Sequence, residues 1–122
     1  MANDFKRFTK PDVGTSTGAS SDAVYTVPAG GGATALESIV IGITLANKAA
    51  TGITADVFLD NYDGSNDVYI VKGASIPAGS SLEIMSGNKI VVQNNGTTGD
   101  VLRAESSATS SIDVVLSVLE DV

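Results

Sequence analysis

Hydrophobic and polar residues alternate along most of this chain with a period of two. The segment ESIVIGITLAN, residues 37–47, places four large aliphatic side chains on one side of an extended backbone, namely Ile39, Ile41, Ile43 and Leu45. The segment SIDVVLSVLE, residues 111–120, has the same pattern. Such alternation is typical of half-buried β-strands, and the abundance of Val, Ile and Thr agrees with it. No segment combines helical periodicity with capping residues, so the sequence predicts almost no helix.

Clusters of Gly, Asn, Asp and Ser separate the alternating stretches. The expected strands cover residues 23–27, 36–46, 53–60, 67–72, 81–85, 88–93, 100–105 and 111–119. About eight short strands divided by turn signals predict an all-β fold, an antiparallel β-sandwich of jelly-roll-like character. The predicted core consists of aliphatic residues on the inward side of these strands: Ile39, Ile41, Ile43, Val57, Leu59, Ile70, Ile84, Val91, Leu102, Val114 and Leu116.

One four-residue phrase occurs twice, as VPAG at residues 27–30 and as IPAG at residues 76–79. Proline fixes φ and lacks the N–H of a strand ladder, so it ends pairing at a strand tip. The glycine that follows is free to adopt positive φ and lets the chain turn. The phrase therefore predicts two similar corners where the chain crosses between the sheets of a sandwich.

The first 22 residues differ from the rest, because they are polar and end in the loop-like sequence VGTSTGASSD. We expect an extended N-terminal arm over residues 1–22 and the β-sandwich domain over residues 23–122. The arm contains five candidate partner-binding residues: Phe5, Lys6, Arg7, Phe8 and Lys10. Aromatic side chains in a polar arm suit anchors for another subunit, and the cations suit capture of an acidic surface. Two alternatives stay open, namely that the aromatics fold back on the sandwich and that the cations belong to a solvated terminus.

Composition restricts the possible chemistry. The chain of 122 residues contains neither His nor Cys nor Trp. Without His and Cys there is no imidazole or thiolate metal site, no disulfide, and no Ser-His or Cys-His nucleophile pair. The net charge of −7 opposes binding to a phosphate backbone, and no apolar run is long enough to span a membrane. We therefore expect no enzyme activity, no cofactor, no nucleic-acid partner and no membrane association.

Two acidic groupings are weak candidates for a site. The loop at residues 60–67 contains Asp60, Asn61, Asp63, Asn66 and Asp67, whose oxygens could bind calcium, but their spacing does not fit the helix-loop-helix calcium motif. An exposed hairpin uses the same residue types.

Three glutamates lie within predicted strands, namely Glu37, Glu83 and Glu105. Glycoside hydrolysis needs two carboxylates that face one cleft, and nothing in the sequence brings these three together.

The chain as a whole resembles a family of small virion structural proteins of tailed bacteriophages, frequent in phages of marine bacteria and cyanobacteria. The resemblance rests on MANDFKRFT at the start, on VPAG and IVIGITLAN, on IPAGSSLEI with GDVL, and on SIDVVLSVLE at the end. It implies a β-sandwich present in many copies on the particle and carries no catalytic residues.

Three functions follow as hypotheses. The first is a capsid decoration or cement protein, made in the host cytoplasm and bound to the major capsid protein on the outer surface of the phage head. The second is a neck, tail, baseplate or fibre component of the virion. The third is a carbohydrate-binding module, for which Tyr62 and Tyr69 are the nearest candidate stacking residues. Self-association as a homo-oligomer is also expected, with a trimer as one option.

Overall fold

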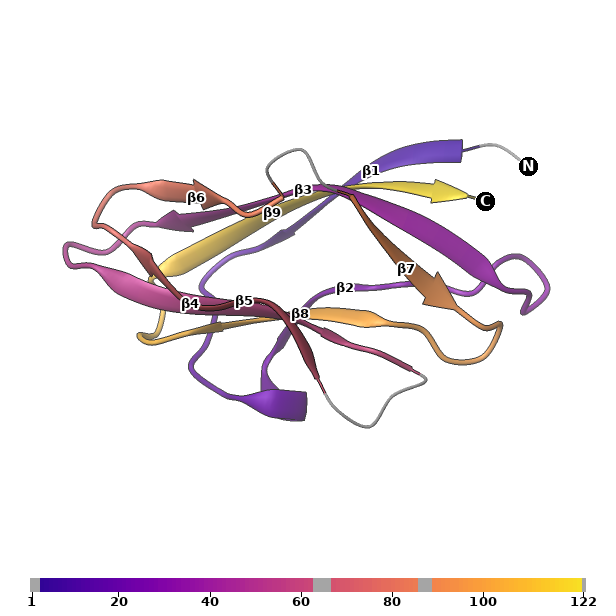
Figure 1. Cartoon of the computed structure of the whole chain (residues 1–122), viewed down its shortest axis with the longest axis horizontal. Coiled ribbons are helices and arrows are strands. Elements are labelled where there is room, and N and C mark those ends of the chain that lie inside the picture. The colour runs from indigo at the N-terminus through magenta and orange to yellow at the C-terminus, as the bar shows by residue number, and fades with distance from the viewer. Residues whose placement is uncertain (1–2, 63–66, 86–88, 122) are drawn as a thin grey trace.

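The computed structural model describes residues 3–62, 67–85 and 89–121, and in these ranges it contains two antiparallel sheets (Figure 1). The five-stranded sheet consists of β1 (Asn3–Lys10), β9 (Ile112–Asp121), β3 (Leu36–Asn47), β6 (Ser81–Glu83) and β7 (Ile90–Asn94), with both β6 and β7 on the far side of β3. The four-stranded sheet consists of β2 (Asp22–Thr26), β8 (Val101–Ser106), β4 (Ile53–Asp60) and β5 (Val68–Ile76). One short 3₁₀ turn, Gly18–Ser20, precedes β2. The predicted all-β sandwich is confirmed.

All eight predicted strands are present, and β1 is a ninth that the sequence did not predict. β1 lies in the segment expected to be an extended arm, and it pairs with β9 over 8 residues, from Asn3 opposite Asp121 to Lys10 opposite Val114. Beyond β1, the side chain of Val13 is completely buried. The arm prediction is therefore corrected, because this segment packs as an edge strand of the sandwich. The inward side of β1 carries Lys6, Phe8 and Lys10 rather than a row of aliphatic residues, so the pattern that marks the other strands is absent from this segment.

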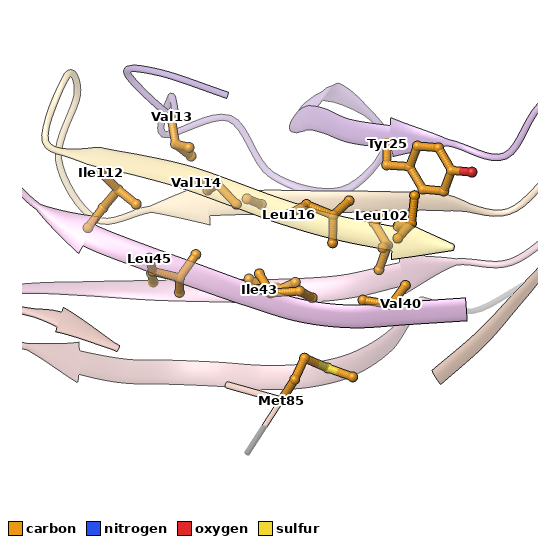
Figure 2. Close-up of a cluster of buried hydrophobic side chains, with 14 of the residues drawn as sticks. Val13, Tyr25, Val40, Ile43, Leu45, Met85, Leu102, Ile112, Val114 and Leu116 are labelled. Carbon is orange, nitrogen blue, oxygen red and sulfur yellow. The ribbon is translucent and has the colours of Figure 1, made fainter. Parts of the chain in front are cut away.

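The core lies between the two sheets and is mostly aliphatic, with Tyr25 as a buried aromatic and with β3 and β9 contributing much of it (Figure 2). Five residues of the predicted core are buried, namely Ile43, Val57, Leu102, Val114 and Leu116. Three others are half-buried at its margin, namely Leu59, Ile70 and Ile84.

Three predicted core residues are wrong, because they lie on the outer face of the five-stranded sheet. A register shift between Val40 and Gly42 of β3 inserts one residue against β9. Such a bulge inverts the alternation, so the inward side passes from Val40 to Ile43, and Ile39 and Ile41 face outward. On β7, Val92 is buried and Val91 is 56% exposed.

The two proline phrases are corners, as predicted. The first follows β2 and the second begins at the last residue of β5, and after each the chain leaves the four-stranded sheet for the five-stranded sheet. The residues before the prolines, Val27 and Ile76, are buried. Gly79 adopts φ of 69° and donates its N–H to Asn47 O at 3.0 Å, which fixes the second corner against the end of β3.

The bulge in β3 makes a direct prediction for two isoleucines that simple alternation would place on the same face. Ile43→Ala should reduce the free energy of unfolding by about 2–5 kcal/mol, because a buried side chain is lost and a cavity remains. Ile41→Ala should cost less than about 1 kcal/mol, because Ile41 is 38% exposed. Urea unfolding of both variants measures the difference, and equal losses would contradict the position of the bulge.

Candidate functional site

The structure divides the five candidate partner-binding residues between the two faces of β1. Phe5 and Arg7 lie opposite Leu119 and Ser117 of β9, on the outer face of the sheet. Phe5 is 79% exposed, the largest exposed fraction of any large hydrophobic side chain in the described ranges. Lys6, Phe8 and Lys10 lie on the opposite face of the strand, toward the other sheet.

Phe5 begins a row of four apolar side chains that crosses four strands. In register, Phe5 of β1 lies opposite Leu119 of β9, Leu119 opposite Ile39 of β3, and Ile39 opposite Val91 of β7. Phe5 and Val91, at the two ends of the row, are 79% and 56% exposed, and the two residues between them are half-buried. We call this set the outer apolar row.

Further apolar side chains lie on the same face. Ile41 and Val115 are 38% and 44% exposed, and Arg7 lies on β1 two residues beyond Phe5. Isolated exposed hydrophobic residues are ordinary on protein surfaces, but an aligned group on one sheet face is characteristic of a contact surface. The sequence contains these residues, and the alternation assigned Ile39, Ile41 and Val91 to the core. A glycine in the middle of β3, Gly42, is the available sequence signal for the bulge that turns the two isoleucines outward.

Beneath β1, a buried carboxylate joins strands from both sheets. Glu120 of β9 is 1% exposed. Its Oε2 accepts a hydrogen bond of 2.5 Å from the Tyr25 hydroxyl of β2, and that hydroxyl lies 2.9 Å from Ser38 Oγ of β3. Lys6 Nζ lies 2.8 Å from Oε1 and is the only partner of this oxygen in the described part of the chain. The Phe8 ring packs on the Tyr25 ring, with centroids 4.5 Å apart.

This network accounts for two of the candidate residues within the chain itself. Burial raises the pKa of the Tyr25 hydroxyl, and the hydrogen bond to Glu120 raises it further, so Tyr25 remains a donor. Hydrogen bonding to Glu120 and attraction to its charge raise the pKa of the Lys6 ammonium. Lys6 and Phe8 therefore hold β1 on the sandwich. The alternative that the aromatics fold back on the sandwich is thus correct for Phe8, whereas Phe5 and Arg7 remain exposed.

Tyr25→Phe should reduce the free energy of unfolding by about 1–3 kcal/mol, because the buried Glu120 Oε2 and Ser38 Oγ both lose their hydrogen bond to the tyrosine hydroxyl. Tyr69→Phe is the matched control, since Tyr69 is 40% exposed and its ring, which packs on Phe58, is retained in the variant. Its effect should stay within about 0.5 kcal/mol. Chemical denaturation measures both, and equal effects would contradict a supporting role for the Tyr25 hydroxyl.

A polar pocket of about 180 Å³ opens on the outer side of the four-stranded sheet, and it is lined by Thr15, Thr17, Thr54, Asp56, Glu105, Ser106 and Ser107. Asp56 and Glu105 are cross-strand neighbours on β4 and β8. Glu105 is 5% exposed, and its Oε2 accepts a hydrogen bond of 2.8 Å from Gly18 N–H. Asp56 accepts a hydrogen bond of 2.6 Å from Gly73 N–H. The sequence does not predict this pair, because Asp56 and Glu105 are brought together only by the pairing of β4 with β8.

Burial raises the pKa of Glu105, and its hydrogen bond with the Asp56 carboxyl raises it further. A carboxyl pair that shares a proton holds the strands together at low pH and repels at high pH. The other mid-strand glutamates do not join this pair. Glu83 accepts hydrogen bonds from Thr44 Oγ1 at 3.0 Å and from Met85 N–H at 2.8 Å, and Glu37 is exposed on β3.

The calcium hypothesis gains no support from the described residues. Residues 63–66 of the acidic loop lie outside them. Asp60 Oδ2 lies 3.0 Å from Arg103 Nε and is used in that ion pair. In the part of the chain that the structure describes, no group of three or more carboxylates lies close enough together to hold a metal ion.

Glu105→Gln should become more stable relative to the native chain as the pH rises from about 4 to about 8. A folded-state pKa above the unfolded value of about 4.3 stabilises the fold below that value, and this contribution is lost as the pH rises through the folded pKa. Glutamine does not ionise, and its carbonyl oxygen still accepts from Gly18 N–H. Urea unfolding over a pH series measures the difference, and a difference independent of pH would contradict the shifted pKa.

Comparison of this chain with protein-family models, with curated proteins and with solved structures found no match. Over the described ranges, none of the secondary structure is a helix with the length and apolar character needed to cross a bilayer.

Proposed function

We propose that this chain is a structural protein of a tailed-phage virion that decorates the outside of the head and binds the major capsid protein. The resemblance of its sequence to small virion proteins suggests the particle. The outer apolar row, formed by Phe5, Leu119, Ile39 and Val91, is the observation that carries the proposal of a binding role.

The chemistry of this face suits attachment to another protein. Exposed aromatic and aliphatic side chains at the centre of an interface supply much of the binding free energy, and Arg at its border supplies orientation and capture rate. Phe5 and Arg7 provide these two roles next to each other on β1. The net charge of −7 keeps the rest of the surface well solvated, which suits a protein displayed on the exterior of a particle.

The neck or tail of the virion is the alternative location, and the same sheet face would serve there. Copy number separates the two, because a head decoration protein is present in hundreds of copies and a neck or tail component in far fewer. Quantitative mass spectrometry of purified particles measures this number. A copy number of a few dozen or less would exclude the head location and leave the binding face unaffected.

A carbohydrate-binding module is less well supported. Sugar rings stack on free aromatic faces, and Tyr69 already packs against Phe58 at a centroid distance of 5.1 Å. Lys72 Nζ lies 4.3 Å from the Tyr69 ring centroid. The Tyr69 ring therefore already has two partners within the chain, and Tyr69 does not line the polar pocket.

The proposal predicts that Val91→Glu reduces binding to particles that lack this protein by at least tenfold. A charge introduced into an apolar contact is desolvated without a partner. Val91 is 56% exposed, so the fold should tolerate the substitution. Ser75→Glu adds the same charge at an exposed position of β5 in the other sheet and should bind like the native chain.

Co-sedimentation of each purified variant with the particles measures binding, and circular dichroism verifies that each is folded. Native-like binding by Val91→Glu would exclude the outer face as the contact surface. Loss of binding by both variants would assign the effect to charge rather than to the outer apolar row.

A further inference from the structure

The edge of the five-stranded sheet at β1 is open. β1 is the terminal strand in the order β1-β9-β3-β6 and pairs on one side with β9 (Figure 1). In the described ranges, no hydrogen bond links the backbone of residues 3–10 to a segment other than β9. Open edge strands tend to pair with another strand, and natural proteins place charges on them to control that pairing.

We infer that β1 pairs antiparallel with β1 of a second copy of this chain, about a two-fold axis at Phe5. This inference concerns self-association and does not depend on the proposed function. It rests on the charge order of the strand, which reads Asp4, Phe5, Lys6 and Arg7. In an antiparallel pair centred on one residue, the residues before it face those after it.

Centring on Phe5 gives the pairing with complementary charges. Asp4 then lies opposite Lys6 of the second copy, and the symmetry repeats this contact, so two pairs of opposite charge flank two facing Phe5 rings. The Lys6 ammonium has three N–H donors, so it can keep its ion pair with Glu120 of its own chain. Opposite charges and aromatic pairs directly across strands are both stabilising. Both Asp4 and Lys6 lie on the same face of β1, so the pairing keeps the inner and outer faces in register.

Neighbouring registers lose this complementarity. Centring on Lys6 places two Lys6 ammonium groups directly opposite each other, and centring on Arg7 does the same for two guanidinium groups. Like charges directly opposite each other are destabilising. Centring between two residues would place an outer-face residue opposite an inner-face residue, which breaks the division of faces shown by the pairing of β1 with β9.

The pairing also extends the outer apolar row. Phe5 is the row's end member at the sheet edge, and it is 79% exposed. A second Phe5 across the edge would join the two rows end to end. The combined row would then run from Val91 of one copy through the two Phe5 rings to Val91 of the other. A two-fold contact of this kind pairs residues 3–7 of the open edge in both copies, so a third copy cannot pair with the same residues and association through them ends at a dimer.

Site-directed cross-linking tests the register, because the natural chain contains no cysteine. Phe5→Cys places two thiols opposite each other on the axis and should form a covalent dimer in high yield with an oxidant or a short bis-maleimide. Arg7→Cys is the matched control, since its thiols would lie about 13 Å apart along the strands. Val91→Cys is the second control, on the same face but at the far end of the row.

Efficient cross-linking of the Phe5→Cys variant alone is the result expected. Preferential cross-linking of the Arg7→Cys variant would overturn the register. Equal cross-linking of the Phe5→Cys and Val91→Cys variants would overturn the edge pairing in favour of face-to-face packing.

Sedimentation of the uncross-linked protein over a concentration series supplies an independent measurement. The native chain should form a dimer, and Phe5→Glu should weaken association at least tenfold, because two like charges would then face each other. Val91→Glu should dimerise like the native chain. A native chain that stays monomeric throughout the series would overturn the inference and would identify the charges of β1 as protection of a free edge. No particles are used, so these outcomes are independent of particle binding.

Discussion

The buried carboxylate of Glu120 is the polar group that holds β1, β2 and β9 together in this sandwich. A buried carboxylate is stable in a fold only when its oxygens are paired, and here the partners are Tyr25 and Lys6. These residues come from the last strand, from the edge strand of the other sheet, and from the first strand. One network therefore fixes the spacing of the two sheets and the attachment of β1. The position of the exposed residues of β1, Phe5 and Arg7, therefore depends on the Glu120 network.

The alternation of side chains on β1 gives this short polar strand two separate roles. Lys6 and Phe8 face inward and hold the strand on the fold, while Phe5 and Arg7 face outward. The exposed apolar side chains carry a risk of nonspecific association, which a net charge of −7 offsets. A protein that keeps such a row exposed on one sheet face gains a contact surface, and this links the local structure of β1 to both proposals.

Buried polar side chains also fix the connections of a chain that has no disulfide. Asn47, 2% exposed, donates from Nδ2 to the carbonyls of Thr51 and Ile76, each at 2.9 Å, and so joins the end of β3 to the second proline corner. Asp100 accepts from the backbone N–H groups of Tyr62 and Gln93 at 3.0 and 2.8 Å. These bonds satisfy backbone groups where strands end, and they hold each connection in one defined conformation.

The sequence alone determined the all-β class, eight of the strands and the two proline corners, because period-two alternation and the chemistry of proline act locally. It also indicated Ile43 and Leu116 as core. Tertiary pairing decided the rest. A single inserted residue beside Gly42 reversed the face of Ile41, and pairing with β9 converted a polar arm into an edge strand. Burial on one side of a strand depends on what packs there, and contacts between residues distant in sequence leave no periodic signal in either segment.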